Sequence, residues 1–113
     1  IRACARWGVE GRRDPSATGV WVGGAKVCAL GVRVRRWVTT HGLALNVTTN
    51  LDHFRLIVPC GLVGRPVTTL SQILGTGCPS MVDVKIAMAE ELGARVTRAA
   101  EEAERKRAAA GSA

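Results

Sequence analysis

The sequence lacks the residues that two classes of binding protein require. Among its 113 residues there is no tyrosine, and there is only one phenylalanine. Aromatic platforms on which single-stranded nucleic acid stacks its bases are therefore scarce. No apolar run approaches the ~18 residues that a membrane-spanning helix needs. We therefore expect neither nucleic acid nor a membrane as partner.

The four cysteines lack the spacing of metal sites and of disulfide scaffolds. They stand at positions 4, 28, 60 and 78 and form no C-x-x-C pair. Zinc sites use such pairs, and small secreted domains have a higher cysteine density. We expect reduced thiols in an intracellular protein, with no metal and no cofactor. The stretches "GVEGRR" and "VGGAK" also lack the glycine and lysine spacing of a phosphate-binding loop.

The net charge of +7 is unevenly distributed. Residues 1–60 carry nine Lys or Arg against three Asp or Glu, whereas residues 80–113 carry six of each. The excess includes Arg33, Arg35 and Arg36. A positive face attracts acidic partners over long distances, whether nucleic acid or protein. A basic surface that is merely solvated explains the charge equally well.

The first half of the sequence predicts strands. Residues 1–18 read as a loop or connector. Residues 20–22, the pair Gly23-Gly24 and residues 25–36 predict a β-hairpin with a two-residue turn. In its second strand valine and arginine alternate, so the valines should face the core and the arginines water.

The second half predicts a short strand and then helices. Alternation predicts a strand over 43–47, and a turn or short helix at 51–54 precedes a β-branched run that ends at Pro59. "VTTLSQILG" predicts a short helix with a threonine cap and Gly75 as its stop.

A longer helix follows Pro79. Ser80 and Asp83 resemble a capping box, and residues 104–113 should fray. One helical stripe contains the apolar residues Met81, Val84, Met88, Leu92, Val96, Ala99 and Ala103. Strands followed by helices, in a chain of this length, indicate one domain of the α/β or α+β class.

Cys60 has the most unusual setting of the four cysteines. It follows Pro59 in a predicted loop at a strand end, where catalytic residues concentrate. The next residue, Gly61, lets a substrate approach backbone N–H groups that stabilise an oxyanion. Free cysteines are also among the most buried residue types, so a thiol that only fills space is the alternative.

Lys26 and His41 are the two candidate partners of this thiol. An ammonium group lowers a thiol pKa by favouring the thiolate, although a lysine at this position also suits an exposed strand edge. A Cys–His pair is the commoner arrangement, although a histidine before a glycine also suits a turn. We assign Cys4, Cys28 and Cys78 to packing.

Three blocks of the sequence together resemble a known family. They are "TGVWVGGAKVCALGVRVRR", "HGLALNV" and "IVPCGL". In order and separation they resemble the octanoyltransferases of lipoate biosynthesis, the octanoyl-[acyl-carrier-protein]:protein N-octanoyltransferases. The resemblance covers roughly residues 18–71. It implies an acyltransferase with the α/β fold of the biotin and lipoate protein ligases.

The resemblance also implies roles for individual residues. Cys60 is the nucleophile that carries the acyl thioester, and Lys26 lowers its pKa and handles protons, as a Cys–Lys dyad. Two stretches line the acyl substrate, and they consist of Ala29, Leu30 and Gly31 and of His41, Gly42, Leu43 and Ala44. The resemblance assigns His41 no individual role.

The resemblance further implies partners and a location. The donor is octanoyl-acyl carrier protein, and the acceptors are lipoyl domains of 2-oxoacid dehydrogenase complexes and the glycine cleavage H protein. Such enzymes work in bacterial cytoplasm, mitochondria or plastids. Acyl carrier proteins and lipoyl domains are usually acidic, which suits the basic first half.

The sequence departs from the family pattern in one respect. The family has an N-terminal half in which a glycine-rich R-G-G…T…H block forms the other wall of the acyl pocket, and no such block is present. We therefore expect residues 1–113 to be the C-terminal portion of a single octanoyltransferase catalytic domain, with the activity of this piece by itself in question. A non-catalytic basic module that binds nucleic acid or protein is the alternative function, and so is a partial relative kept for protein interaction.

Strand parity places a condition on the predicted pocket. Lys26 has the parity of Cys28, whereas Ala29 and Gly31 have the opposite parity. If both groups line one pocket, a bulge or twist must lie between them, or Lys26 must bend in from the strand end.

Overall fold

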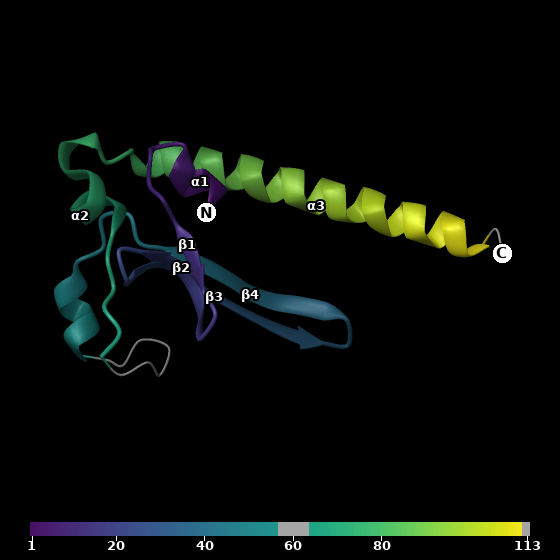
Figure 1. The fold of residues 1–113 in the computed structure, drawn as a ribbon, viewed down its shortest axis with the longest axis horizontal. Coiled ribbons are helices and arrows are strands. Elements are labelled where there is room, and N and C mark those ends of the chain that lie inside the picture. The colour runs from purple at the N-terminus through teal and green to yellow at the C-terminus, as the bar shows by residue number, and fades with distance from the viewer. Residues whose placement is uncertain (57–63, 112–113) are drawn as a thin grey trace. The chain divides into compact units, whose positions relative to one another are not determined.

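The computed structural model describes residues 1–56 and 64–111 of the chain (Figure 1). It divides into two compact units, Ile1–Pro79 and Ser80–Ala113. The first unit contains the sheet and the second a single long helix, so the predicted order of strands first and helices last is confirmed.

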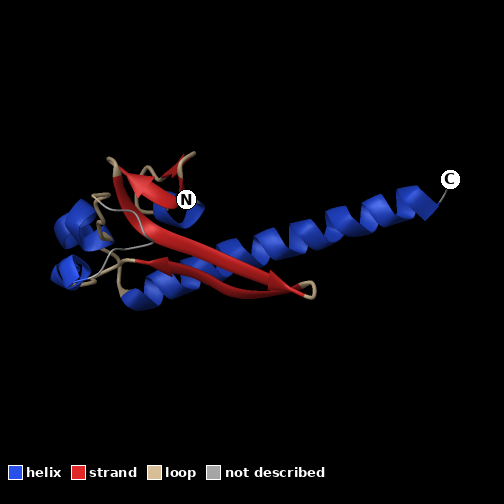
Figure 2. Cartoon of the chain, turned by 90° about the horizontal axis from the view of Figure 1, so that it is seen from below, coloured by secondary structure: helices blue, strands red, loops and turns tan. Residues whose placement is uncertain are grey.

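A four-stranded antiparallel sheet with strand order β1-β2-β3-β4 forms the first unit. Its strands are β1 (Arg12–Asp14), β2 (Ala17–Val22), β3 (Ala25–Arg35) and β4 (Val38–Leu45). Figure 2 shows that β3 and β4 are the long pair and extend beyond the two shorter strands. The sheet therefore has a covered inner half and a two-stranded outer half.

The two turns that flank β3 each have two residues, but the sequence indicated only one of them. Gly23 and Gly24 join β2 to β3 with φ of 56° and 82°, as predicted, because two positive φ values favour glycine. Arg36 and Trp37 join β3 to β4 with φ of 50° and 65°. Non-glycine residues give no such signal, so the prediction that the next strand begins at residue 43 was wrong.

The prediction of a loop over residues 1–18 was also wrong. Residues Arg2–Ala5 form the short helix α1, whose Ala3 and Cys4 are buried. Strand β1 pairs with β2, which already begins at Ala17. Tertiary packing stabilises these two elements, because a one-turn helix and a three-residue strand are too short to be stable alone.

The core of the first unit lies under the inner half of the sheet. Val27 and Leu70 are completely buried there. The outer half of the hairpin is exposed, and the expectation that its valines face the core was wrong, since Val32 and Val34 are 62% and 61% exposed. They lie beyond the end of β2, where β3 pairs only with β4.

Short helical elements follow the sheet. The 3-10 helix η1 (Leu51–Leu56) confirms the predicted turn or short helix at 51–54. It includes residues 55–56 of the predicted β-branched run, and the remainder of that run, with Pro59 and Cys60, lies outside the described residues.

Helix α2 (Leu70–Leu74) confirms the predicted short helix. The hydroxyl of Thr69 accepts a hydrogen bond from the Gln72 N–H at 3.1 Å, which caps the first turn. Gly75 ends the helix with φ of 57° and begins the 3-10 turn η3 (Gly75–Gly77).

The second unit is the helix α3 (Met81–Gly111). As predicted, Ser80 caps it, because its hydroxyl accepts a hydrogen bond from the Asp83 N–H at 3.2 Å. Residues 104–111 are helical in the structure. The predicted fraying of residues 104–113 is not tested by it and stays a prediction. Among the described helices, none has the length and apolar character required to span a bilayer.

Candidate functional site

Lys26 is the one member of the predicted dyad that the structure describes. Cys60 and Gly61 lie outside the described residues, and their predicted roles stay predictions. Lys26 is only 6% exposed, so it is not the exposed edge lysine considered above. Its backbone N–H donates to the Pro66 carbonyl and its carbonyl accepts from the Thr68 N–H, both at 2.9 Å. These bonds anchor the segment 66–68 beside the first residues of β3.

A β-bulge in β3 removes the parity conflict of the predicted pocket. Lys26 lies opposite Trp21 and Cys28 lies opposite Val20, so Val27 is an extra residue in β3. Continuing this register places Ala29 opposite Gly19, two residues from Trp21 and therefore on the same face. Lys26 and Ala29 thus share a face, and of the three alternatives named above the structure contains the bulge.

The register of β3 with β4 divides the predicted acyl-lining residues into two groups. Ala29 pairs with Ala44 and Gly31 pairs with Gly42, which places these four on the face of Lys26. Leu30 pairs with Leu43, and His41 pairs with Val32, so the remaining three lie on the opposite face. The structure therefore joins Lys26 to a strip of alanine and glycine and separates it from Leu30, His41 and Leu43.

This strip of Ala29, Gly31, Gly42 and Ala44 is open in the described part of the chain. Ala29 is half-buried and the other three are exposed. A Cβ atom built on Gly31 or Gly42 would meet no heavy atom within 4 Å. The described residues thus leave this face of the two strands unobstructed.

His41 has an unusual backbone for a strand residue. Its φ is 71°, in the left-handed region that few non-glycine residues adopt. Its side chain is exposed and lies on the face away from Lys26. The geometry thus gives no support to a shared site of His41 and Lys26.

The sequence did not indicate a cluster of side chains around Lys26. The Lys26 ammonium lies 5.0 Å from the centroid of the Trp21 ring, and the Arg65 guanidinium carbon lies 4.2 Å from the same centroid. Trp21 is buried, and its indole N–H donates to the Ala17 carbonyl at 2.9 Å. Arg65 also forms an ion pair with Asp14. Lys26 lies opposite Trp21 in the β2–β3 hairpin, but Arg65 is far from both in the sequence, so no local pattern indicates the whole cluster.

Asp14 is held in its charged form by local hydrogen bonds. The Ser16 hydroxyl and the Ser16 N–H both donate to one carboxylate oxygen, at 2.6 and 2.8 Å. These bonds, followed by the bond from Arg65, lower the pKa of Asp14 to about 2. Asp14 therefore supplies Arg65 with a permanent negative charge at neutral pH. The only sequence signal is the turn-forming "DPS".

The described cysteines behave largely as predicted. Cys4 and Cys28 are buried, and burial raises the pKa of both thiols. The Cys28 thiol donates to the Ala29 carbonyl at 3.6 Å. Cys78 is only half-buried. All three are free, and the described residues contain no group of His, Cys, Asp and Glu that could hold a metal ion.

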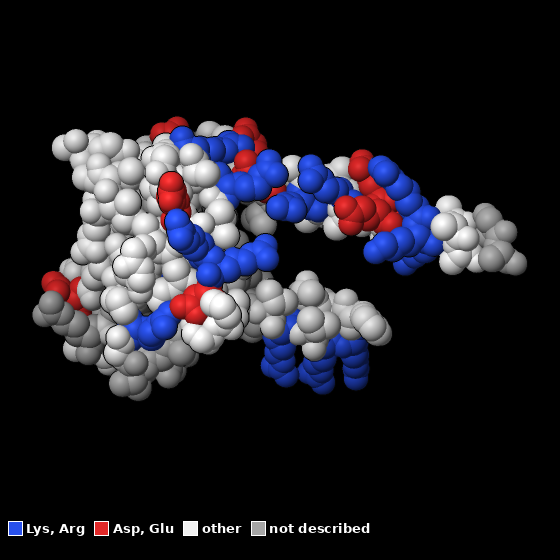
Figure 3. Space-filling model, in the orientation of Figure 1, with Lys and Arg blue, Asp and Glu red and all other residues white. Residues whose placement is uncertain are grey.

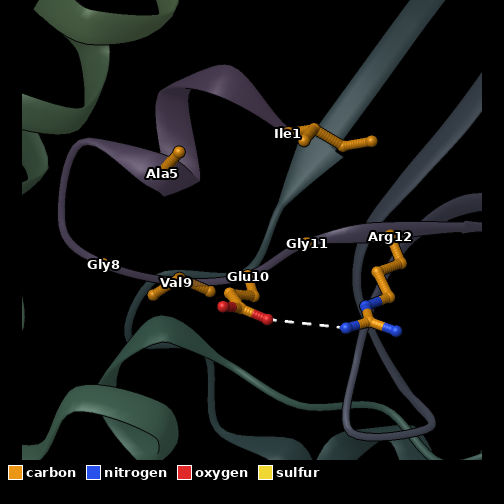
Figure 4. Close-up of a pocket in the computed structure, with 7 residues that line it drawn as sticks. All are labelled: Ile1, Ala5, Gly8, Val9, Glu10, Gly11 and Arg12. Carbon is orange, nitrogen blue, oxygen red and sulfur yellow. Dashed lines mark ion pairs between the residues drawn. The ribbon is translucent and has the colours of Figure 1, made fainter.

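A cavity lies near the start of the chain. Its volume is about 420 Å³, and Figure 4 shows its lining residues, which are Ile1, Ala5, Gly8, Val9, Glu10, Gly11 and Arg12. An ion pair of 3.5 Å joins Glu10 and Arg12 at its edge. None of the predicted acyl-lining residues contributes to it.

The outer hairpin displays the arginines that the sequence singled out. Arg33 and Arg35 are exposed and alternate along β3 on the face of Ala29 and Gly31, and Arg36 is exposed in the turn. Figure 3 shows basic side chains standing in a row on this part of the hairpin. The basic row, defined as Arg33, Arg35 and Arg36, thus continues beyond the alanine and glycine strip.

Comparison with known proteins identifies relatives over most of the chain. Residues 1–93 match the family model of the lipoyl protein ligase A/B catalytic domain. An octanoyltransferase of Geobacter metallireducens is 54% identical over 79 residues, which is 70% of this chain and 37% of that protein. A mitochondrial octanoyl-[acyl-carrier-protein]:protein N-octanoyltransferase of Xenopus tropicalis is 56% identical over 75 residues, or 66% of this chain and 31% of that protein. The chain thus spans about a third of the length of the curated relatives it matches.

Proposed function

This chain belongs to the lipoyl protein ligase A/B catalytic domain family, and on that premise we propose that it takes part in octanoyl transfer to lipoyl domains. The observation that carries the proposal is the position of Lys26, buried at the head of an open strip of alanine and glycine. Such a strip accommodates an unbranched acyl chain, because it has no side chain larger than a methyl group. The names of the relatives support the same reaction.

The proposed reaction has two steps. The Cys60 thiolate attacks the carbonyl of octanoyl-acyl carrier protein, the bond to the carrier sulfur breaks, and the carrier leaves as a thiol after taking up a proton. A lysine amine of the lipoyl domain then attacks the Cys60 thioester, forms an amide and loses a proton as the Cys60 thiolate leaves. The positive charge of Lys26 favours that thiolate, and Lys26 handles the protons.

We further propose that residues 1–113 form the C-terminal portion of a single catalytic domain. This portion supplies the Cys60–Lys26 pair and one wall of the acyl site. The remaining length of the relatives then supplies the other wall. The bacterial relatives and the mitochondrial relative support bacterial cytoplasm or an organelle as the location.

The basic row on the outer hairpin is the proposed docking surface for the acidic carrier and acceptor domains. Charge reversal in an Arg33→Glu/Arg35→Glu chain should raise the Kd for octanoyl-acyl carrier protein roughly tenfold at low salt, because attraction turns into repulsion. Titration calorimetry over a salt series measures this change. An Arg105→Glu/Lys106→Glu chain in α3 is the control with the same charge change. A salt dependence equal to that of the wild type in the hairpin variant would contradict the docking role.

Intact-mass measurement tests the proposed function directly. Incubation with octanoyl-acyl carrier protein should add one octanoyl group to the chain, and later addition of a lipoyl domain should move that group to the acceptor lysine. If the acyl site needs its second wall, the chain alone will form no adduct. The same measurement is therefore made on a chimera, in which the N-terminal remainder of the Geobacter metallireducens relative precedes residues 1–113. The proposal is wrong if neither protein acquires the adduct. Tight, salt-sensitive binding of DNA or RNA without an adduct would favour the basic binding module instead.

A further inference from the structure

The side chain of Lys26 is held in place by residues that have no assigned role. We propose that Trp21, Arg65 and Asp14 are positioning residues for the Lys26 ammonium. The inference rests on the proposed function only in taking Lys26 as the group that acts on the reacting thiol. The contacts themselves are independent of that role.

The Trp21 ring is the platform of this cluster. The Lys26 ammonium and the Arg65 guanidinium both lie within cation–π distance of its centroid, at 5.0 and 4.2 Å. The ring cannot turn freely, because it is buried and its indole N–H is bonded to the Ala17 carbonyl. A fixed aromatic face therefore defines where the end of a flexible lysine chain rests.

Arg65 and Asp14 supply the charge balance. Two cations beside one ring repel each other unless a negative charge compensates one of them. Asp14 pairs with Arg65, and its own charge is secured by two hydrogen bonds from Ser16. The Nε of Arg65 is buried without a hydrogen-bond partner among the described residues, so the ring and Asp14 hold this guanidinium.

The backbone on both sides of Lys26 is tied to the same segment. Arg65 directly precedes Pro66, whose carbonyl accepts the Lys26 N–H, and the Lys26 carbonyl accepts from Thr68. The methylene chain of Lys26 passes over Gly19, where a Cβ would lie 3.0 Å from Cε and 3.2 Å from Cδ. The backbone, the methylene chain and the ammonium group of Lys26 are thus each constrained by a different neighbour.

Lysine acylation in the folded chain tests this arrangement without requiring enzymatic activity. The sequence has only three lysines, Lys26, Lys85 and Lys106, so the two in α3 are internal references for a water-soluble N-hydroxysuccinimide acetate. In Trp21→Leu and Arg65→Met chains, acetylation of Lys26 relative to these references should rise roughly three- to tenfold, because the ammonium leaves the ring. Trp21→Phe keeps a ring and should stay near the wild type. Arg65→Lys keeps only the positive charge, so its relative acetylation of Lys26 should lie between those of the wild type and Arg65→Met.

Two controls separate positioning from folding. Circular dichroism and the native-state reactivity of the buried Cys4 and Cys28 thiols report whether the core is intact. If folded Trp21→Leu and Arg65→Met chains both acetylate Lys26 at the wild-type ratio, the positioning role is overturned. A variant whose Cys4 and Cys28 thiols become reactive is unfolded, and its acetylation ratio is not used. If Trp21→Leu is unfolded, the acetylation ratios of Arg65→Met and Arg65→Lys decide the positioning role, because Arg65 is half-exposed and its replacement disturbs the core less.

Octanoylation rates link the cluster to the proposed function. In whichever protein forms the adduct, the single-turnover rate should fall roughly 10- to 100-fold in Arg65→Met and recover in part in Arg65→Lys, with KM unchanged. An unchanged rate together with increased acetylation of Lys26 would show that the cluster holds a lysine without a part in the reaction. Absence of the adduct in both the chain and the chimera would refute the proposed function, whereas the acetylation ratios would still decide the positioning role.

Discussion

A Cys60→Ser chain is expected to form the octanoyl adduct slower than the wild type by a factor on the order of 10³ or more. A serine hydroxyl is almost entirely protonated at neutral pH, whereas a thiol beside an ammonium group ionises readily. Time-resolved intact mass with octanoyl-acyl carrier protein measures the rate, in the chimera if the chain alone forms no adduct. Cys78→Ser is the matched control, because Cys78 is a free and half-buried thiol.

Alkylation kinetics give the same prediction a second readout. Burial raises the pKa of Cys4 and Cys28, so both thiols should react slowly with iodoacetamide at neutral pH. Cys60 should be alkylated first and Cys78 next, as peptide mapping at short times would reveal. The prediction is contradicted if Cys60→Ser retains the adduct, or if Cys60 reacts as slowly as the buried pair.

Replacement of Leu70 by alanine should have the largest effect on stability. Leu70 is completely buried, and its N–H donates to the Asn46 carbonyl at 2.9 Å. Loss of its side chain leaves a cavity under the inner half of the sheet, which lowers the free energy of unfolding by about 2–5 kcal/mol. Small domains have only about 5–15 kcal/mol in total, so Leu70→Ala should unfold at much lower denaturant concentration.

Leu56→Ala is the matched control for this change. Leu56 is 83% exposed, so the same deletion should change the free energy of unfolding by less than about 0.5 kcal/mol. Urea titrations followed by circular dichroism compare the two variants. Equal midpoints would contradict the burial of Leu70. Its loss should also loosen the neighbouring segment 66–68, which is bonded to the backbone of Lys26.

The elements predicted correctly are those that local chemistry specifies. Gly23-Gly24 suits a turn with two positive φ values, and a threonine and a serine cap α2 and α3 through bonds to N–H groups three residues on. The elements predicted wrongly depend on distant partners. The turn at Arg36-Trp37 adopts positive φ without glycine, because the long β3–β4 pairing imposes it.

The candidate site was likewise predicted only in part from the sequence. Lys26 and the alanine and glycine stretches were implied by the resemblance of the three blocks, and Ala29, Gly31, Gly42 and Ala44 lie on the face of Lys26. Their role at an acyl site stays a prediction. Leu30, His41 and Leu43 were predicted with them but lie on the opposite face. A block of consecutive residues in a strand necessarily contributes to both faces, so a sequence match does not separate them.

The sequence by itself determined the hairpin and the helix caps, because these depend on residue type and short spacing. The family followed from three blocks in order and separation, and the resemblance to it implied the Cys60–Lys26 pair, which stays a prediction. Only the tertiary structure decided which residues share the face of Lys26. That choice depends on the extra residue Val27, which is defined by pairing with β2. The cluster of Trp21, Arg65 and Asp14 likewise joins residues up to 51 positions apart. Such contacts form only when the strands and the segment after them fold together.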